Sequence, residues 1–369
     1  MEIFVVSIAT VLTSFILNVI ITPVIIRLSH RYKWYDIPDK RKIHTGLIPR
    51  LGGFGMFVSA MLAFVIVILA SRLIGRTAIE ASIPPSALFF FIPLILIHIT
   101  GLIDDFHNLK ALFKFIIQLL AASIVTIGGY LIRDLTIPYL GTIHLGFIAY
   151  PATVLWIVGI TNALNLVDGM DGLAGGIAGF AALSLGIIMM IKGNMLAGLL
   201  SFAILGAIFG FLFFNFPPAK IFMGDSGSLF LGFSLSVIPL IPLKNNSPFP
   251  GILIAAITLF MIPIIDTATA ILRRLHEGRP IYSPDRKHLH HRLLGIGLGE
   301  RKILAIIYSF SAYLSAVAIT SMVLPKEANI YFISIIWIGS LLAYILFNFI
   351  ESKKLDSEQS GAERKVREK

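Results

Sequence analysis

The sequence predicts an all-α, polytopic integral membrane protein, and three observations lead to this prediction. Hydrophobic residues make up 57% of the 369 positions and charged residues only 14%, a composition far from that of soluble domains. About eleven stretches are apolar over most of the roughly 20 residues that a transmembrane helix needs. The basic residues are concentrated in alternate loops between these stretches, which is the pattern that orients membrane helices.

The apolar stretches are expected to be the spans of a single transmembrane catalytic domain, residues 1–350. They cover residues 3–26, 51–74, 86–103, 112–132, 151–167, 173–191, 196–214, 228–243, 251–272, 302–323 and 329–350. The first stretch is too long for the core of a signal peptide and follows Glu2 instead of a basic leader, so we expect it to remain as a span. The tail, residues 351–369, is rich in Lys, Glu and Ser and is expected to be disordered.

The distribution of basic residues predicts the orientation of the chain. If the first loop, residues 27–50, and every second loop after it are cytoplasmic, 24 of the 30 Lys and Arg residues lie inside. The N-terminus is then outside and the C-terminus cytoplasmic. This topology explains the net charge of +10 without a nucleic-acid partner, and it suits the inner (cytoplasmic) membrane. On the outer side, alternating apolar residues in the segment 133–150 predict a short hairpin.

The same orientation gathers the acidic residues on the cytoplasmic face. The Asp residues in cytoplasmic loops or at cytoplasmic span ends are Asp36, Asp39, Asp104, Asp105, Asp168, Asp171, Asp225, Asp266 and Asp285. The chain has no cysteine, so disulfides, thiolate nucleophiles and Cys-ligated metals are excluded. We therefore expect one active site, on the cytoplasmic side, built from carboxylates.

The most polar span end is the stretch 162–176. Asn162, Asn165, Asp168 and Asp171 follow one another at intervals of three residues. A single Asp at the centre of a membrane helix costs roughly 2.5–3.5 kcal/mol, so such a cluster implies a polar ligand. Gly169 and Gly172 are expected to break the helix so that the acids can converge. An ordinary turn would explain the glycines but not the repeated Asn and Asp.

Two further acidic motifs predict a Mg²⁺ site. Asp104 and Asp105 end one span, and adjacent carboxylates stay ionised only when a cation or basic neighbours such as Lys110 and Lys114 offset their charge. A solvated helix end is an equally good account of this pair alone. Asp225, in a Gly-Asp-Ser-Gly-Ser loop, adds a third acid. Acids on separate spans suit Mg²⁺ shared with a diphosphate, although Ser226 or Ser228 could simply cap the next helix.

Two basic loops could contact phosphate. In the first, Lys42, His44 and Arg50 precede a Gly-Gly span entrance. On their own they are better explained as charges that set topology, and the alternative is contact with a lipid phosphate.

The second basic loop contains three near-adjacent histidines and an arginine, namely His288, His290, His291 and Arg292. A zinc site is disfavoured, because the histidines are surrounded by Arg and Lys and the chain has no cysteine. Neutralisation of phosphate oxygens beside a carboxylate-bound metal fits this composition better.

Taken together, these motifs resemble the polyprenyl-phosphate N-acetylhexosamine-1-phosphate transferase family over most of the chain. The resemblance is carried by Asp104-Asp105, the Asn-x-x-Asn-x-x-Asp-x-x-Asp stretch from Asn162, the loop from Asn215 through Asp225, and His288-x-His-His. The amino-acid sequences of the two basic loops are similar to those of the branch that uses UDP-N-acetylglucosamine (UDP-GlcNAc). The Pro-x-His-His-His run of the peptidoglycan branch is absent.

The resemblance implies a reaction in which undecaprenyl phosphate attacks UDP-GlcNAc, giving undecaprenyl-diphospho-GlcNAc and UMP. The runner-up is transfer of phospho-MurNAc-pentapeptide or another N-acetylhexosamine phosphate. A secondary transporter is a distant alternative, because transporters place their sites near the midplane between repeats, whereas these acids lie at span ends and no repeat is visible. A homodimer is left open.

The resemblance also implies roles for individual residues. Asp104, Asp105, Asp225 and His288 are expected to be catalytic, with Asp225 and Asp105 holding Mg²⁺ or Mn²⁺ and Asp104 orienting or deprotonating the lipid phosphate. The expected substrate-binding residues are Lys42, His44, Arg50, Lys110, Lys114, Asn162, Asn165, Asp168, Asp171, Asn215, His290, His291 and Arg292. A phosphate monoester is already mostly a dianion at neutral pH, so direct attack is favoured over a covalent aspartyl-phosphate.

Overall fold

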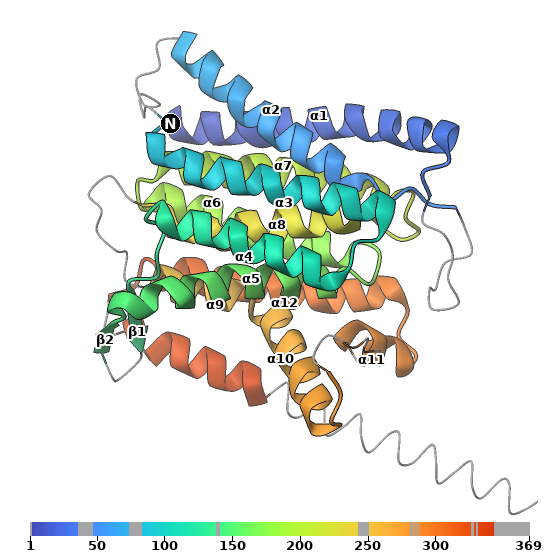
Figure 1. Cartoon of the computed structure of the whole chain (residues 1–369). Helices are drawn as coiled ribbons and strands as arrows, with labels where there is room; N and C mark the ends of the chain where they lie inside the picture. The colour runs from blue at the N-terminus through green and yellow to red at the C-terminus, as the bar shows by residue number, and fades with distance from the viewer. Residues whose placement is uncertain are drawn as a thin grey trace, which may run out of the picture.

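The computed structural model describes residues 2–35, 47–73, 83–137, 141–242, 251–280, 283, 285, 288–325, 328–329 and 331–342. The described part is a bundle of long helices with one small hairpin (Figure 1). Lys42, His44 and the tail 351–369 lie outside the described residues.

The helices follow one another in the order of the predicted spans. They are α1 (Glu2–Tyr32), α2 (Gly52–Leu73), α3 (Leu88–His107), α4 (Ala111–Ile127), α5 (Ala149–Val167), α6 (Leu173–Ile191), α7 (Met195–Asn215), α8 (Gly224–Val237), α9 (Ile252–Leu259), α10 (Met261–His276), α11 (Leu289–Gly295) and α12 (Glu300–Ser321), with a further helix at Tyr331–Leu342. Short 3₁₀ turns lie at Pro85–Ala87, Gly146–Ile148 and Ile238–Leu240. The predicted hairpin forms from β1 (Asp134–Ile137) and β2 (Gly141–His144), paired antiparallel with Asp134 opposite His144.

The fold is that of an all-α, multi-pass membrane protein. Among the described residues, seven helices are long and apolar enough to cross a bilayer, or eight if the bent pair α9 and α10 counts as one span. The bend between α9 and α10 is 69°, and α10 leaves the direction of the other helices toward α11 (Figure 1). Three predicted spans correspond to α4, α8 and the helix Tyr331–Leu342, whose described lengths are shorter.

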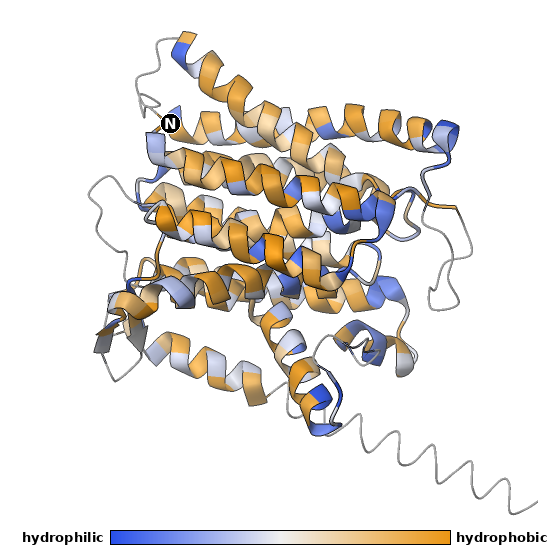
Figure 2. Cartoon of the chain, in the orientation of Figure 1, coloured by the Kyte–Doolittle hydropathy of each residue, from blue (hydrophilic) through white to orange (hydrophobic). Residues whose placement is uncertain are grey.

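Helix α1 buries its polar side chains and exposes its apolar ones, as expected when the surroundings are lipid (Figure 2). Ser14 Oγ donates to the carbonyl of Ala203 at 2.6 Å, and Asn18 Nδ2 donates to Ser59 Oγ at 3.1 Å. Gly206 of α7 allows this approach, because a side chain there would collide with the backbone of α1. Small residues that let two helices touch are the usual basis of packing in membranes.

Helix α8 is enclosed by α2, α3 and α5, and nearly all of its residues are buried. Glycines make this close packing possible at the start of the helix. A Cβ added to Gly101 of α3 would lie 2.6 Å from the Cα of Ser226, and one added to Gly53 of α2 would collide with the backbone of Gly227. The acidic end of α3 is thereby pressed against the first turn of α8.

Gly101→Ala is expected to disturb this contact. Overpacking a tight interior costs typically about 1–3 kcal/mol, so the variant should unfold at a lower temperature than the wild-type protein in detergent. Gly159→Ala is the matched control, since it is also a helical glycine but a Cβ there meets nothing within 4 Å. Equal unfolding temperatures for the two variants would contradict the packing described above.

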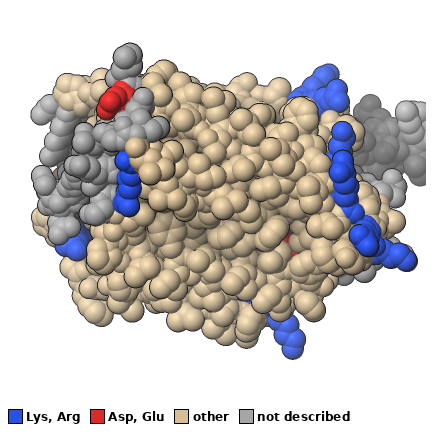
Figure 3. Space-filling view, turned by 90° about the horizontal axis from the view of Figure 1, so that it is seen from above, with Lys and Arg blue, Asp and Glu red and all other residues tan. Residues whose placement is uncertain are grey.

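Charged side chains avoid the middle of the bundle. In Figure 3, Lys and Arg gather toward the left and right ends of the molecule and also stand at its lower edge, while most of the face between is without them. The C-terminal ends of α3 and α5 and the N-terminal ends of α4 and α8 meet at one of these ends, because Asp104, Lys114, Asn165 and Asp225 are in contact there. This end holds the candidate site.

Candidate active site

Asp104 closes the turn between α3 and α4. Its Oδ1 accepts a hydrogen bond from the backbone N–H of Leu109 at 2.6 Å, and its Oδ2 accepts one from Lys114 Nζ at 3.2 Å. Asn108 adopts a left-handed conformation (φ 46°), which reverses the chain directly after α3. The turn brings Lys114, one helical turn into α4, back over the buried carboxylate.

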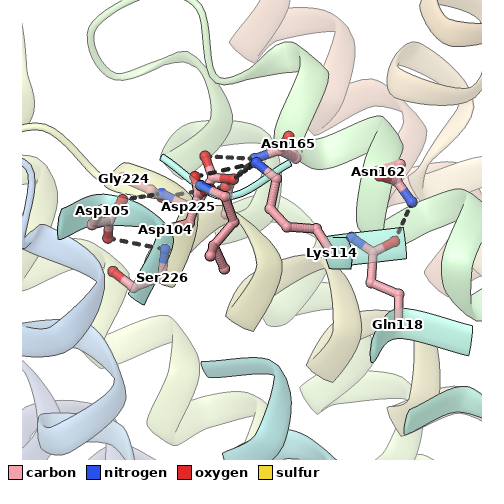
Figure 4. Close-up of polar contacts among 11 residues, drawn as sticks. Asp104, Asp105, Lys114, Gln118, Asn162, Asn165, Gly224, Asp225 and Ser226 are labelled. Carbon is pink, nitrogen blue, oxygen red and sulfur yellow. Dashed lines mark hydrogen bonds and ion pairs between the residues drawn. The ribbon is translucent and has the colours of Figure 1, made fainter. Parts of the chain in front are cut away.

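Asp225 lies on the other side of the same ammonium group. Lys114 Nζ is 2.6 Å from Asp225 Oδ2, so one lysine bridges two carboxylates that come from different helices. Asn165 Nδ2 approaches Asp225 Oδ1 at 3.3 Å and also donates to Ser228 Oγ at 2.8 Å. Figure 4 shows Asp104, Asp225, Lys114 and Asn165 converging on one point. The three-residue pattern of the central stretch therefore brings at least one of its members into the site.

Asp105 points to a different target from its neighbour. Its Oδ1 accepts from the N–H of Asp225 at 2.7 Å and its Oδ2 from the N–H of Ser226 at 3.1 Å (Figure 4). These are N–H groups of the first turn of α8, which have no partner within the helix. Gly224 makes room for this contact, with φ +70° and a would-be Cβ only 2.5 Å from Asp105 Oδ1.

This geometry gives the two adjacent acids different partners. We expected Asp105 to share a metal with Asp225; in the structure each oxygen of Asp105 accepts one backbone N–H, and the metal assignment stays a prediction. Asp104 has the carboxylate that lies across Lys114 from Asp225. Asp105 anchors the first turn of α8, and Asp104 and Asp225 form the charged pair.

The donor set fits a hard divalent cation that is completed by substrate. In the described ranges, no group of three or more His, Asp or Glu side chains forms a metal cage. Mg²⁺ does not need one, since it commonly binds one or two carboxylates together with waters and substrate phosphates. Asp104 and Asp225 supply two carboxylates that already share a cation, the ammonium of Lys114. These residues could therefore hold Mg²⁺ only in company with water or a diphosphate.

The central stretch leaves α5 where the glycines predict. The helix ends at Val167, and Gly172 has φ +77° immediately before α6. Burial raises the pKa of Asp168 to about 8, and the charges of Asp225 and Asp105 act in the same direction. The Asp168 carboxyl therefore holds its proton more tightly than an ordinary Asp does. Asn162 instead faces α4, where its amide donates to Gln118 Oε1.

Two residues that we expected to bind substrate have structural partners. Asp171 Oδ2 accepts from the N–H of Ala219 at 2.9 Å. The carboxamide of Asn215 accepts from the N–H of Gly172 at 2.8 Å and donates to the carbonyl of Ile221 at 2.8 Å. Both side chains are buried. They fasten the loop 216–223 to the start of α6, and their assignment as direct substrate contacts stays a prediction.

The first basic loop reaches the site through its backbone. The N–H of Phe222 donates to the carbonyl of Pro49 at 2.7 Å, and the N–H of Gly53 donates to the carbonyl of Met223 at 2.8 Å. Arg50 is held between these contacts, close enough for its charge to act on Asp168. Taken alone, the loop was better explained by topology, and the family resemblance implied that Arg50 binds substrate; the structure brings Arg50 to the edge of the acidic cluster.

The histidine loop is organised by Asp266, a residue that the sequence analysis noted but did not include in the site. Asp266 Oδ2 lies 2.8 Å from His288 Nδ1, and Asp266 Oδ1 accepts from the N–H of Leu289 at 2.8 Å. Both Asp266 and His288 are buried. A carboxylate on Nδ1 fixes the ring and leaves Nε2 for another group. The available signal was an acid on a long apolar span, which is costly without a partner.

His290 connects the histidine loop to the central stretch. Burial lowers its pKa to about 4, and the neighbouring His291 acts in the same direction, so the ring is neutral. Its Nε2 is buried without a hydrogen-bond partner among the described residues, and a Cβ added to Gly169 would lie 2.7 Å from it. His290 and His291 have ring centroids 4.2 Å apart. Arg292 follows on α11, and Lys110 is exposed at the start of α4.

Comparison with known proteins identifies the family of the chain. A model described as glycosyl transferase family 4 matches residues 87–242. The chain is 38% identical over 349 residues to the "Probable undecaprenyl-phosphate N-acetylglucosaminyl 1-phosphate transferase" of Bacillus subtilis (strain 168), covering 94% of this chain and 89% of that protein.

Two other relatives are more distant. The "Decaprenyl-phosphate N-acetylglucosaminephosphotransferase" of Mycolicibacterium smegmatis is 37% identical over 313 residues, covering 76% of this chain and 73% of that protein. The "Undecaprenyl-phosphate alpha-N-acetylglucosaminyl 1-phosphate transferase" of Escherichia coli (strain K12) is 28% identical over 324 residues, covering 85% of this chain and 82% of that protein. The extent of the match to the Bacillus relative, together with the family model, shows that the chain belongs to glycosyl transferase family 4.

Proposed function

We propose that this protein transfers GlcNAc-1-phosphate from UDP-GlcNAc to undecaprenyl phosphate, giving undecaprenyl-diphospho-GlcNAc and UMP. The observation that carries the proposal is the Asp104–Lys114–Asp225 cluster at one end of a membrane bundle. A site there can receive a lipid phosphate from the bilayer and a nucleotide from water. The printed names of the Bacillus and Escherichia relatives, which specify an undecaprenyl phosphate and N-acetylglucosamine, support the choice of substrates.

The proposed topology places the site on the cytoplasmic face. The chain would cross the cytoplasmic membrane about eleven times if the shorter helices α4, α8 and Tyr331–Leu342 also cross, with the N-terminus outside and the C-terminus inside. The excess of Lys and Arg in loops at the site's end supports this orientation. The lipid-linked product would then be the first intermediate of a cell-surface glycan.

In the proposed mechanism, Asp225 and Asp104 would hold Mg²⁺ together with the diphosphate of UDP-GlcNAc. The metal, when bound, polarises the diphosphate and neutralises charge on departing UMP. Asp105 keeps the first turn of α8 in place and so fixes the position of Asp225. His288, oriented by Asp266, presents Nε2 as an acceptor to a hydroxyl group of the sugar. Because the lipid phosphate is mostly a dianion already, these residues contribute by positioning more than by proton transfer.

The test is a UMP-release assay with purified protein. We expect UMP only when undecaprenyl phosphate and UDP-GlcNAc are both present, and we expect EDTA to abolish release and added Mg²⁺ to restore it. UDP-MurNAc-pentapeptide and other UDP-sugars are offered in parallel to test the runner-up activity. If the protein turns over a different UDP-sugar and not UDP-GlcNAc, the proposed donor is wrong. UMP release without lipid acceptor would show a covalent intermediate in place of direct attack.

A further inference from the structure

Lys114 occupies the position between the two carboxylates that are proposed to hold the metal. Its Nζ is 2.6 Å from Asp225 Oδ2 and 3.2 Å from Asp104 Oδ2, and the side chain is only 21% exposed. The two acids come from α3 and α8, far apart in the sequence, so the lysine is the cation that allows them to lie close together. Figure 4 shows the stem of Lys114 reaching across from α4 to this point.

An ammonium group or a divalent ion could each offset the repulsion between the two carboxylates. Two carboxylates at close range repel each other unless a cation lies between them. A divalent ion bound to these oxygens would be within a few ångströms of the ammonium, and two cations at that distance repel strongly in a partly buried site. Both cations cannot occupy the position, so binding of one requires the other to leave.

We propose that Lys114 is an internal counter-ion of the Asp104–Asp225 pair, which divalent metal displaces and which then contacts the diphosphate of the donor. This inference rests on the proposed function. A lysine suits the exchange, because its point charge sits on a flexible four-carbon stem and can be redirected without moving the helix. The departing ammonium remains close to the metal and meets the negative oxygens that a diphosphate brings to it.

The proposal predicts opposite effects on metal binding and on turnover. Lys114→Met removes the competitor, so metal affinity should rise. A neighbouring cation lowers the affinity of a carboxylate for a proton by about 1–3 pKa units. The same repulsion acts on a metal ion, so we expect Mn²⁺ to bind Lys114→Met at least about tenfold more tightly than the wild-type protein. The same variant lacks the cation that contacts the diphosphate, so its kcat should fall by about a hundredfold or more. If Lys114 had a purely structural role, its replacement by Met would not raise metal affinity.

The experiment measures binding of Mn²⁺ alone, without nucleotide or lipid, to the full-length protein in detergent by electron paramagnetic resonance of free Mn²⁺. Lys114→Arg keeps a cation and should bind Mn²⁺ about as the wild-type protein does. Lys220→Met, which removes an exposed lysine from the loop before α8, is the matched control for loss of one charge and should leave affinity unchanged. Asp225→Asn should bind Mn²⁺ least.

Thermal unfolding supplies the second readout. In EDTA, Lys114→Met should unfold at a lower temperature than the wild-type protein, because the two carboxylates then lack a counter-ion. Mn²⁺ should raise its unfolding temperature more than that of the wild-type protein, as tighter binding to the folded state requires. If Lys114→Met is too unstable to purify, Lys114→Gln is used in both measurements.

Affinity that is unchanged or weaker in Lys114→Met would overturn the exchange. So would Mn²⁺ binding to Asp225→Asn that equals binding to the wild-type protein. The UMP assay separates this failure from failure of the proposed function. If wild-type protein forms UMP from both substrates in a metal-dependent way while Lys114→Met shows no gain in affinity, only the exchange is rejected. If wild-type protein forms no UMP with any UDP-sugar, the proposed function itself is rejected.

Discussion

Asp225→Asn is expected to reduce UMP formation by about a thousandfold or more at saturating UDP-GlcNAc, since removal of one group that stabilises transition-state charge already costs about 10²–10³. Asn has nearly the same size as Asp but lacks the charge that holds Lys114 at 2.6 Å and is proposed to hold Mg²⁺. The contact with Asp105 uses the backbone N–H of residue 225, so the first turn of α8 should survive the substitution. The loss should therefore appear in kcat without unfolding of the protein.

The measurement is UMP release at several concentrations of nucleotide and Mg²⁺. Asp134→Asn is a suitable control, because Asp134 is also a paired carboxylate but lies in the β1–β2 hairpin opposite His144. It should keep near-normal turnover. Near-normal turnover of Asp225→Asn would show that the metal and the chemistry lie elsewhere.

Asp266→Asn is expected to lower kcat by about a hundredfold, the upper range for loss of a group that orients a functional histidine. Asp266 accepts from His288 Nδ1 at 2.8 Å and from the N–H of Leu289 at 2.8 Å. An Asn can donate its amide N–H to Nδ1, which would move the ring proton to Nε2. His288 would then present a donor where it now presents an acceptor.

A double-mutant cycle with His288→Gln tests whether the two residues act together. If Asp266 acts only through His288, the double variant should be no slower than the slower single variant. If the loss of kcat in the double variant instead equals the product of the two single losses, Asp266 and His288 have separate roles. Asp285→Asn provides the control, since Asp285 belongs to the same loop but pairs with Arg273 at 2.5 Å, and it should affect turnover much less.

The membrane fold could be predicted from the long apolar stretches. The clustering of acids distant in the sequence could be predicted because acidic residues are rare in apolar spans and these lie at span ends. Asp104 and Asp225 end or begin such spans, and their burial in lipid without a partner would be costly. The break after α5 and the hairpin were likewise visible, from glycines and from alternation. The spans, the helix break and the hairpin each depend on the residues of one short segment, and a sequence pattern describes such a segment directly.

The roles within the site could not be predicted, because they depend on how helices pack. Asp104 and Asp105 are adjacent, and successive residues on a helix point about 100° apart. Only the position of α8 decides that Asp105 meets its N–H groups and that Asp104 meets Lys114. Asn215 and Asp171 showed the same difficulty, since polar residues in a conspicuous motif can serve a loop as well as a ligand.

The length rule for spans had a similar limit. It assumes that a helix must shield its own backbone across the full bilayer, and α8 has 14 residues. Because α8 is enclosed by α2, α3 and α5, the surrounding helices shield it instead. Sequence alone does not show which span will be interior.

The polar stripe of α1 sets a constraint on biosynthesis. Ser14 finds its acceptor 189 residues later in the chain, on α7. At a synthesis rate of about 5–20 residues per second, the first helix waits on the order of 10–40 s in the membrane before that acceptor exists. During this interval the Ser14 hydroxyl must be accommodated by lipid, water or the insertion machinery. The nascent protein is therefore exposed to wrong pairings throughout this interval, in which α3, α4 and α5 are also made.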